Sequence, residues 1–565
     1  MTRIAVAAAA FCMMAVLTGT RGLSVEAQPV ASIALPAPGG TEQLYAGCNL
    51  VAVTFPDGTT SQTVIQAVTP SGVVEALWRY NAGQNRFEAF SPSHPQASDL
   101  LTVDFLGAVW LCMSGGAPAG PSPSPTTPAL APTGVILQEG NNLPQTPFLP
   151  KRSNELADNH IGGGVDGLAP PPGHPSFDYA QIINDITTIG FKRYRLTVEG
   201  PFYVASEFSI DPVYDDVISA LAENGVTLTY FLAFSDTDYR ARGGEVDTPR
   251  FQTEDQIQRY LDFVRFIVHH FKDRIQYYAM WIEPSVEIGL GYIEVEDYIN
   301  LVRRTLPVIR EEYPQAKIIV GDTAYLRTAS QRDYLFTILQ SDIMPLVDVV
   351  SWHPMYGTSP EFDSEYYYQY PAIVEEIKAV ASAHGFRGEY EASEVGWWSR
   401  DLALDPPMDP PYYSNTVVAK YFARGVVIHR GLDVGVNLQA PGPIIEYFIP
   451  GVQSLCTIMA GAEPITMPVQ ISSGATNIRT YSFSLPNGAR LIAVWTDGVA
   501  VDDDPGIKAT LTLKGLSAQG VVGIDILNSL EQPLTTSMEG GTFVIRNLLV
   551  RDYPLILRLT GIGSP

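Results

Sequence analysis

The chain has 565 residues, of which 46% are hydrophobic and 10% aromatic, so it is long enough to bury more than one core. It carries 35 basic and 60 acidic residues, a net charge of -25. That balance repels polyanions and removes the electrostatic attraction on which nucleic-acid binding depends. We therefore expect several folded domains and no nucleic-acid partner.

The first residues predict export from the cell. Arg3 precedes an apolar run, and small residues around Ala27 offer a cleavage site. The run is shorter than the ~20 apolar residues that span a bilayer, and no later stretch of the sequence is long and apolar enough to do so. We interpret residues 1–27 as a signal peptide and expect a secreted, extracellular protein without membrane insertion.

Residues 28–113 consist of short alternating stretches separated by Asp-Gly, Ser-Gly and Ala-Gly turns, a pattern typical of a small β-rich module. We interpret one of these stretches, SQTVIQAV at residues 61–68, as a strand. Cys48 and Cys112 flank this part of the chain. In an oxidising compartment the two can form a disulfide, and the alternative is a pair of buried thiols. No Cys/His spacing resembles a metal site, so we predict neither a metal nor a cofactor.

The middle of the chain predicts a barrel. Residues 114–134 are rich in Pro and Ser, which indicates an extended linker. Over residues 135–455 short apolar strands alternate with amphipathic helices, which favours a parallel sheet covered on both faces. Eight such units favour a (β/α)₈ TIM barrel. Their strands are expected in NHIGGGVDG, GFKRYRLTVEG, VTLTYFLAF, RIQYYAMWIEP, AKIIVGDTAY, VDVVSWHPMYG, RGEYEASEVGW and DVGVNLQAPG.

The last part of the chain, residues 456–565, loses the helical period and alternates between polar and apolar residues. Asn487-Gly488 between two such runs is a hairpin signal. We predict a C-terminal antiparallel β-sandwich here. The fold class is thus α/β: a TIM barrel with a small N-terminal β-module and a C-terminal sandwich.

Polar residues stand where the apolar strands of the predicted barrel end, which is where catalytic groups of such barrels project. In chain order they are Arg195, Asp236, Glu283, Asp322, His353, Tyr356 and Glu394. Two carboxylates that face each other across a sugar can cleave a glycosidic bond. We favour Glu394 over Glu391 because it directly precedes a Gly-Trp turn, and because strand alternation puts the two on opposite faces. For Asp236 and Asp322, substrate contact and loop capping both stay open.

Two of these strands carry a family resemblance. YYAMWIEPSVE and YEASEVGWW are similar to the acid/base and nucleophile strands of the retaining (β/α)₈ glycoside hydrolases, nearest in look to the β-xylosidase and α-L-iduronidase family. The resemblance covers about residues 135–450. It implies that Glu283 is the general acid/base and Glu394 the nucleophile. Their carboxyl groups should then lie about 5–5.5 Å apart, and Glu283 should have the higher pKa.

The resemblance also implies substrate-binding residues around the pair. Arg195 matches an arginine that hydrogen-bonds the nucleophile. His353 and Tyr356 in SWHPMYG resemble a His and a Tyr that line the subsite or orient the nucleophile. Trp397 and Trp398 offer flat apolar faces on which a sugar could stack. Asp236 completes the set as a candidate substrate contact.

Two positions differ from the family pattern. Ile282 replaces the Asn that usually precedes the acid/base, and Gln439 replaces an aromatic residue at the end of the eighth strand. We expect a secreted hydrolase that cleaves an oligo- or polysaccharide with retention, through a glycosyl-enzyme intermediate. The alternative is a non-catalytic glycan-binding protein on a degenerate barrel. A structural surface scaffold is a third possibility, but it leaves the carboxylates at the strand ends unexplained.

Overall fold

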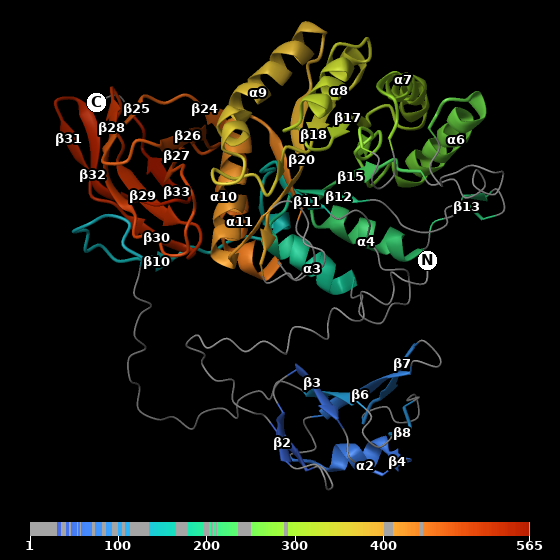
Figure 1. The fold of residues 1–565 in the computed structure, drawn as a ribbon. Coiled ribbons are helices and arrows are strands. Elements are labelled where there is room, and N and C mark those ends of the chain that lie inside the picture. The colour runs from blue at the N-terminus through green and yellow to red at the C-terminus, as the bar shows by residue number, and fades with distance from the viewer. Residues whose placement is uncertain are drawn as a thin grey trace. The chain divides into compact units, whose positions relative to one another are not determined.

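The computed structural model describes residues 31–563 with gaps. The larger gaps are 114–134, 165–178, 197–202, 235–249, 287–291, 401–410 and 440–444, and shorter ones fall within 35–107 and 205–211. The chain divides into two compact units, residues 1–131 and 132–565 (Figure 1). Each is described by itself.

The first unit is β-rich, as predicted. Its strands form antiparallel sheets in the orders β2-β1-β5, β3-β9-β6-β7 and β4-β8. The strands are β1 Ala31–Ala34, β2 Thr41–Leu44, β3 Gly47–Ala52, β4 Thr59–Thr60, β5 Val68–Thr69, β6 Val74–Asn81, β7 Arg86–Phe90, β8 Thr102–Val103 and β9 Ala108–Met113.

The strand that we predicted over residues 61–68 is wrong, because most of it is helix α2, Ser61–Gln66. The Thr60 side chain accepts a hydrogen bond from the Thr63 N–H and thereby caps the helix. Val64 and Ile65 are buried. A local cap thus outweighs the alternation of a short polar-apolar run.

The strand pairing brings the two residues of the predicted disulfide together. Cys48 in β3 lies directly opposite Cys112 in β9. The side chains of both residues lie outside those that the structure describes, and no disulfide occurs among the described side chains. The bridge therefore stays a prediction.

The second unit contains the predicted TIM barrel. Eight parallel strands follow the order β18-β17-β16-β15-β12-β11-β23-β20, and β18 pairs with β20 to close it. All eight strands lie in the segments predicted from the sequence. They are β11 Ile161–Gly164, β12 Arg193–Leu196, β15 Thr227–Phe231, β16 Tyr277–Ala279, β17 Lys317–Thr323, β18 Val349–Trp352, β20 Glu389–Gly396 and β23 Gly435–Gln439.

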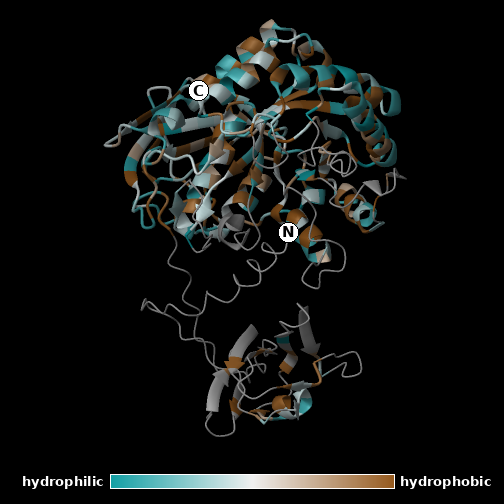
Figure 2. Ribbon diagram, turned by 45° about the vertical axis from the view of Figure 1, so that its right-hand side comes forward, coloured by the Kyte–Doolittle hydropathy of each residue, from teal (hydrophilic) through white to brown (hydrophobic). Residues whose placement is uncertain are grey.

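Helices surround this barrel, and Figure 2 shows hydrophobic and hydrophilic residues on different parts of them. They are α3 Tyr179–Ile189, α4 Pro212–Glu223, α6 Glu254–Phe271, α7 Val295–Glu312, α8 Ala329–Leu339, α9 Ser364–Ala383, α10 Asn415–Gly431 and α11 Ile445–Ile458. Their apolar faces cover the strands, as the helical spacing predicts. No described helix has the length and apolar character needed to cross a bilayer.

Short elements complete the barrel unit. These are η3 Ser153–Glu155, β13 Tyr203–Val204, β14 Glu207–Phe208, η4 Met344–Leu346, β19 Met355–Tyr356, β21 Trp398–Ser399 and β22 Tyr412–Tyr413. The strand β19 pairs in parallel with the end of β20. It therefore carries Tyr356 to the same end of the barrel as Glu394.

The antiparallel sandwich is also confirmed. A seven-stranded sheet, β10-β30-β29-β33-β27-β26-β24, faces a four-stranded sheet, β25-β28-β32-β31. The bounds are β10 Thr146–Pro147, β24 Glu463–Ile465, β25 Val469–Ser473, β26 Ile478–Ser484, β27 Arg490–Thr496, β28 Ile507–Lys514, β29 Gly520–Asp525, β30 Leu530–Pro533, β31 Ser537–Glu539, β32 Thr542–Val550 and β33 Leu555–Thr560. The Asn487-Gly488 turn joins β26 to β27, with Gly488 at a φ of 83°.

In the structure, the sandwich begins at other residues than those that we predicted from the sequence. The boundary that we set before residue 456 falls inside α11, and the sandwich strands resume at β24. Leu137 packs in the sandwich core, and β10 pairs with β30. The start of the segment 135–455 therefore belongs to the sandwich, because its apolar residues fill that core.

Candidate active site

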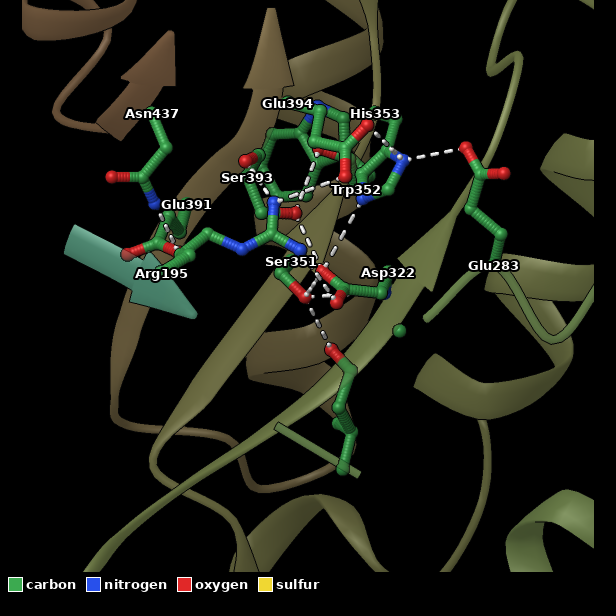
Figure 3. Close-up of polar contacts among 12 residues, drawn as sticks. Arg195, Glu283, Asp322, Ser351, Trp352, His353, Glu391, Ser393, Glu394 and Asn437 are labelled. Carbon is green, nitrogen blue, oxygen red and sulfur yellow. Dashed lines mark hydrogen bonds and ion pairs between the residues drawn. The ribbon is translucent and has the colours of Figure 1, made fainter. Parts of the chain in front are cut away.

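The polar residues that end the barrel strands meet at one end of the barrel (Figure 3). Arg195 lies in β12, Asp322 in β17, Tyr356 in β19 and Glu394 in β20, while Glu283 follows β16 and His353 follows β18. Residues that are far apart in the sequence thus form one cluster, as parallel strands require.

Glu283 and Glu394 face each other across His353 and Tyr356. A carboxylate oxygen of each glutamate and a ring nitrogen of His353 lie within 4.8 Å of one another. The Tyr356 hydroxyl is 2.9 Å from Glu283 Oε1 and 2.7 Å from Glu394 Oε2. This spacing matches two carboxylates that attack and protonate the same bond, and it is shorter than the ~6.5–9.5 Å that would admit a water between them.

Arg195 supplies positive charge next to Glu394. Its Nη1 lies 3.7 Å from Glu394 Oε1, and both side chains are buried. The guanidinium also stacks over the Phe231 ring, 4.1 Å from its centre. A buried cation at this distance stabilises the ionised form of the carboxylate, which a nucleophile needs.

Two residues of the cluster have unusual backbone conformations. Glu283 has a φ of 47° and Asp322 a φ of 46°, which is the left-handed region that side chains other than glycine seldom adopt. The Glu283 N–H donates to the Asp322 carbonyl oxygen at 3.1 Å. Backbone strain of this kind gathers at functional sites, where the surrounding structure maintains it.

Glu391 lies deeper in the barrel than Glu394. Asn437 Nδ2 donates to its Oε1 at 2.8 Å, and Arg193 lies 3.6 Å from its Oε2. The pairing of β20 with β23 shifts register between Ala392 and Val395, so strict alternation breaks there. Because of this shift, the side chains of Glu391 and Glu394 both lie on the inner side of the barrel. Strict alternation, on which our prediction rested, would put them on opposite faces.

His353 is held as a cation by the carboxylates around it. Burial alone would lower its pKa, but Glu394, Asp322 and Glu283 raise it to about 10. Its Nδ1 donates to Glu283 Oε1 at 2.8 Å. Burial would in turn raise the pKa of Glu283, but the hydrogen bonds from His353 and Tyr356 lower it below its usual value. The lowered pKa favours the carboxylate form of Glu283. That Glu283 has the higher pKa of the two glutamates stays a prediction.

Comparison with known proteins supports the fold. No protein-family model matches the chain. A family 39 glycoside hydrolase from the gut symbiont Bacteroides cellulosilyticus WH2 is similar in structure, with a TM-score of 0.54 and 12% identity over 86% of this chain and 94% of that one. The chain thus shares the TIM-barrel fold of that enzyme. At this identity the likeness concerns the fold alone.

Other matches are weaker. A GH30 endoxylanase from Clostridium papyrosolvens C71 has a TM-score of 0.46 and 13% identity, over 74% of this chain and 98% of that one. Among curated proteins, interferon lambda-4 of Homo sapiens is 27% identical over 93 residues. That stretch is 16% of this chain, and the match spans about half of the interferon, 52% of its length.

Within the glycoside hydrolase fold, the two predicted platform tryptophans have different surroundings. Trp397 is 1% exposed, donates its Nε1–H to the Thr358 carbonyl and packs on Phe422. It is a core residue, so our assignment of it to a sugar platform is wrong. Trp398 contacts Tyr356, with ring centres 6.0 Å apart, and thus stays beside the carboxylates. Asp236 lies outside the described residues.

Several site residues were missed or left open by the sequence. Ser393 and Ser351 donate to the Asp322 carboxylate at 2.5 and 2.7 Å. Phe231 and Gln439 line a small cavity beside Glu394. Asp322 and Gln439 could be recognised as candidates from the sequence because each stands at a strand end. No sequence pattern distinguishes Ser351 and Ser393 from other serines.

Glu283, His353 and Glu394 also have the composition of a metal site, since each offers one ligand atom. However, the Tyr356 hydroxyl already lies within 2.9 Å of all three of those atoms. The arrangement therefore suits hydrogen-bonded acid-base chemistry better than metal coordination.

Proposed function

We propose that this protein is a glycoside hydrolase that cleaves an oligo- or polysaccharide with retention of anomeric configuration. Glu394 attacks the anomeric carbon as Glu283 protonates the leaving oxygen, which gives a glycosyl ester on Glu394 and a free sugar or alcohol. Glu283, now a carboxylate, takes a proton from water, and the resulting attack releases the sugar from Glu394.

The observation that supports this proposal most is the close approach of the two carboxylates. Their oxygens lie within 4.8 Å of each other, bridged by the Tyr356 hydroxyl. Direct attack by a carboxylate needs such a short spacing. Arg195 and Tyr356 both contact Glu394, and so they favour its ionised form before attack.

The pKa of Glu283 fits the second half of the reaction. The hydrogen bonds from His353 and Tyr356 that lower it favour the carboxylate, the form that accepts a proton from water. In the first half Glu283 must carry a proton. Entry of a sugar between Glu283 and Tyr356 would break one of these hydrogen bonds and so favour protonation. Secretion through residues 1–27 is part of the proposal and fits an extracellular saccharide.

A second candidate function is glycan binding without catalysis. Ile282, beside Glu283, packs against the apolar cluster of Phe231, Ala279, Ile319 and Val349 and brings no hydrogen-bonding group. Hydrogen bonds to the sugar 2-hydroxyl contribute several kcal/mol in related reactions. Their loss from this position would favour a binding protein.

A panel of aryl glycosides tests the two candidates with wild-type protein, Glu394→Gln and Glu391→Gln. Loss of the nucleophile should lower turnover of the best substrate by at least about a thousandfold. The carboxylate of Glu391 contacts Asn437 and Arg193 deeper in the barrel, so Glu391→Gln should keep most of the activity. Binding without turnover by the wild type, unchanged in Glu394→Gln, would favour the glycan-binding alternative.

A further inference from the structure

Asp322 contacts several residues of the candidate active site. It is 2% exposed and lies in β17, below the two glutamates. Its Oδ2 accepts a hydrogen bond from Arg195 Nη2 at 3.1 Å. Its carbonyl oxygen accepts the Glu283 N–H. One buried residue thus touches both the cation that faces Glu394 and the backbone of Glu283.

The other oxygen of Asp322 is held in place by serines. Ser393 Oγ donates to Oδ1 at 2.5 Å and Ser351 Oγ at 2.7 Å (Figure 3). Ser351 also accepts the Asp322 N–H at 3.1 Å. These contacts fix the carboxylate and explain how it tolerates burial as an anion, because each of its oxygens has a donor. Burial would raise the pKa of Asp322, but Arg195, His353 and Ser393 hold it well below its usual range.

His353 lies between Asp322 and the glutamates. Its Nε2 is 3.6 Å from Asp322 Oδ1, an ion-pair distance, and has no hydrogen-bond partner among the described residues. Its Nδ1 faces Glu283, Tyr356 and Glu394. The ring is fully buried. A buried imidazole nitrogen without a hydrogen bond is costly unless a nearby opposite charge offsets the cost.

When Glu283 is protonated, the charges of the cluster balance only if His353 is a cation. Asp322 and Glu394 are two anions, Arg195 and the imidazolium are two cations, and Glu283 is neutral when it is the proton donor. With a neutral ring the buried cluster would carry an excess negative charge in the proton-donor state. Buried charge without compensation is strongly unfavourable.

We propose that Asp322 is a positioning residue of the active site, whose negative charge keeps His353 an imidazolium and directs its Nδ1–H at Glu283. This inference deepens the proposed function and rests on it for the role of Glu283. The chemistry assigned to Asp322 is that of a fixed anion, since its oxygens face His353, Arg195 and the two serines and none of its contacts is with a reacting carboxylate.

The test is a pH titration of ¹⁵N-histidine-labelled full-length protein by NMR, with the His353 signals assigned by their loss in His353→Gln. In the wild type we expect His353 to stay doubly protonated from pH 5 to 8. Asp322→Asn keeps the shape and an acceptor oxygen but removes the charge. We expect its His353 to lose a proton within that range. The falling limb of the pH profile of kcat/KM on a responsive glycoside should then move to higher pH, because a neutral ring no longer lowers the pKa of Glu283.

Two further variants separate charge from structure. Ser351→Ala removes both hydrogen bonds between Ser351 and Asp322 but keeps the charge, so His353 should stay protonated. Asp342→Asn makes the same chemical change at an exposed ion pair with Arg303 and should leave the titration of His353 unchanged.

The outcomes distinguish this inference from the proposed function. A wild-type His353 that is neutral at pH 7, or one that is equally protonated in Asp322→Asn, would overturn the role of Asp322 whether or not the protein cleaves glycosides. If Asp322→Asn does not fold, a wild-type His353 that is neutral at pH 7 still overturns the role of Asp322. Absence of all glycosidase activity would reject the proposed function and leave the histidine titration as a valid measurement.

Discussion

At the scale of single residues, the site contains three carboxylates with separate environments. Glu394 faces a guanidinium, Glu283 faces an imidazolium and a phenol, and Asp322 is buried beneath both. Environment alone can give chemically identical groups different charges and roles. Here it favours an ionised Glu394, while the proton on Glu283 depends on what fills the space beside Tyr356.

The pH dependence of catalysis follows from these contacts. A proton donor must be protonated, so kcat/KM falls as the pH rises through the pKa of Glu283 in the free enzyme. That pKa is lowered from 4.5, so we expect the falling limb in the acidic range. His353→Gln removes the imidazolium that lowers it and should move this limb to higher pH.

The measurement is the pH profile of kcat/KM on an aryl glycoside. His269→Gln serves as the control, because His269 is exposed and pairs only with Glu312 on the outside of the barrel. Its profile should match that of the wild type. A falling limb that moves to lower pH in His353→Gln would contradict the assignment.

The sequence placed the clustered polar residues of the candidate site better than their neighbours. Glu283, Glu394, Arg195, His353 and Tyr356 each stand at a strand end, and strand ends are readable from apolar runs. Trp397 could not be placed in the same way, because its neighbour Trp398 has nearly the same local pattern. Which of two adjacent indoles enters the core depends on the helix packed against them, which no local pattern specifies.

At the scale of elements, the contact between β20 and α10 is tight. A Cβ at Gly425 would lie 2.7 Å from Trp397 Cη2. Replacing glycine by alanine inside a helix usually stabilises by up to ~1 kcal/mol, but overpacking a core costs about 1–3 kcal/mol. The second effect should win here.

We therefore predict that Gly425→Ala lowers the unfolding free energy by about 1–2 kcal/mol, as the difference between those two effects. Urea denaturation followed by tryptophan fluorescence measures it. A second substitution, Trp397→Leu, should make room and remove the penalty of the alanine. An increase in stability in Gly425→Ala alone would show that Trp397 moves aside without cost.

The elements themselves could largely be predicted, and the exceptions have physical causes. Seven of the eight barrel strands lay in an apolar run with a helical pattern before it, and the first, β11, lay in a glycine-rich segment. The bulge between Ala392 and Val395 could not be foreseen, since a register shift depends on the neighbouring strand. The helix at 61–66 was missed because its cap, Thr60, resembles any other polar residue in a strand pattern.

At the scale of the whole second unit, the barrel and the sandwich share a buried polar interface. Lys420 of α10 lies 2.7 Å from Asp552, and their side chains are 3% and 5% exposed. Arg424, one turn further on, donates to the carbonyl oxygens of Gly498 and Asp552. The sandwich is thereby attached to α10, the helix that packs on β20, the strand of Glu394.

Loss of this interface charge should be costly. Lys420→Met leaves the buried Asp552 carboxylate without its cation, which typically costs about 3–5 kcal/mol. Lys508→Met removes the exposed pair with Glu139 and should cost at most ~1 kcal/mol. Urea denaturation of both variants tests this. Equal losses in the two would contradict the role of Lys420 at the interface.

Domain boundaries were the weakest part of the whole-molecule prediction. The segment around Leu137 precedes the barrel in sequence yet completes the sandwich more than 300 residues later, as the bridge from Gln138 to Leu548 shows. Local composition predicts a linker over residues 114–134, which lie outside the described residues. It does not indicate with which of two distant cores a short apolar segment will pack.

The most direct test of the central claim is azide rescue of Glu283→Ala and Glu394→Ala on a responsive dinitrophenyl glycoside, with the configuration of each glycosyl azide determined by NMR. Azide in place of a missing acid/base attacks the glycosyl ester on Glu394, and azide in place of a missing nucleophile attacks the substrate directly. We predict a product of retained configuration from Glu283→Ala and of inverted configuration from Glu394→Ala. The same configuration from both variants, or the reverse assignment, would contradict the roles given to the two glutamates.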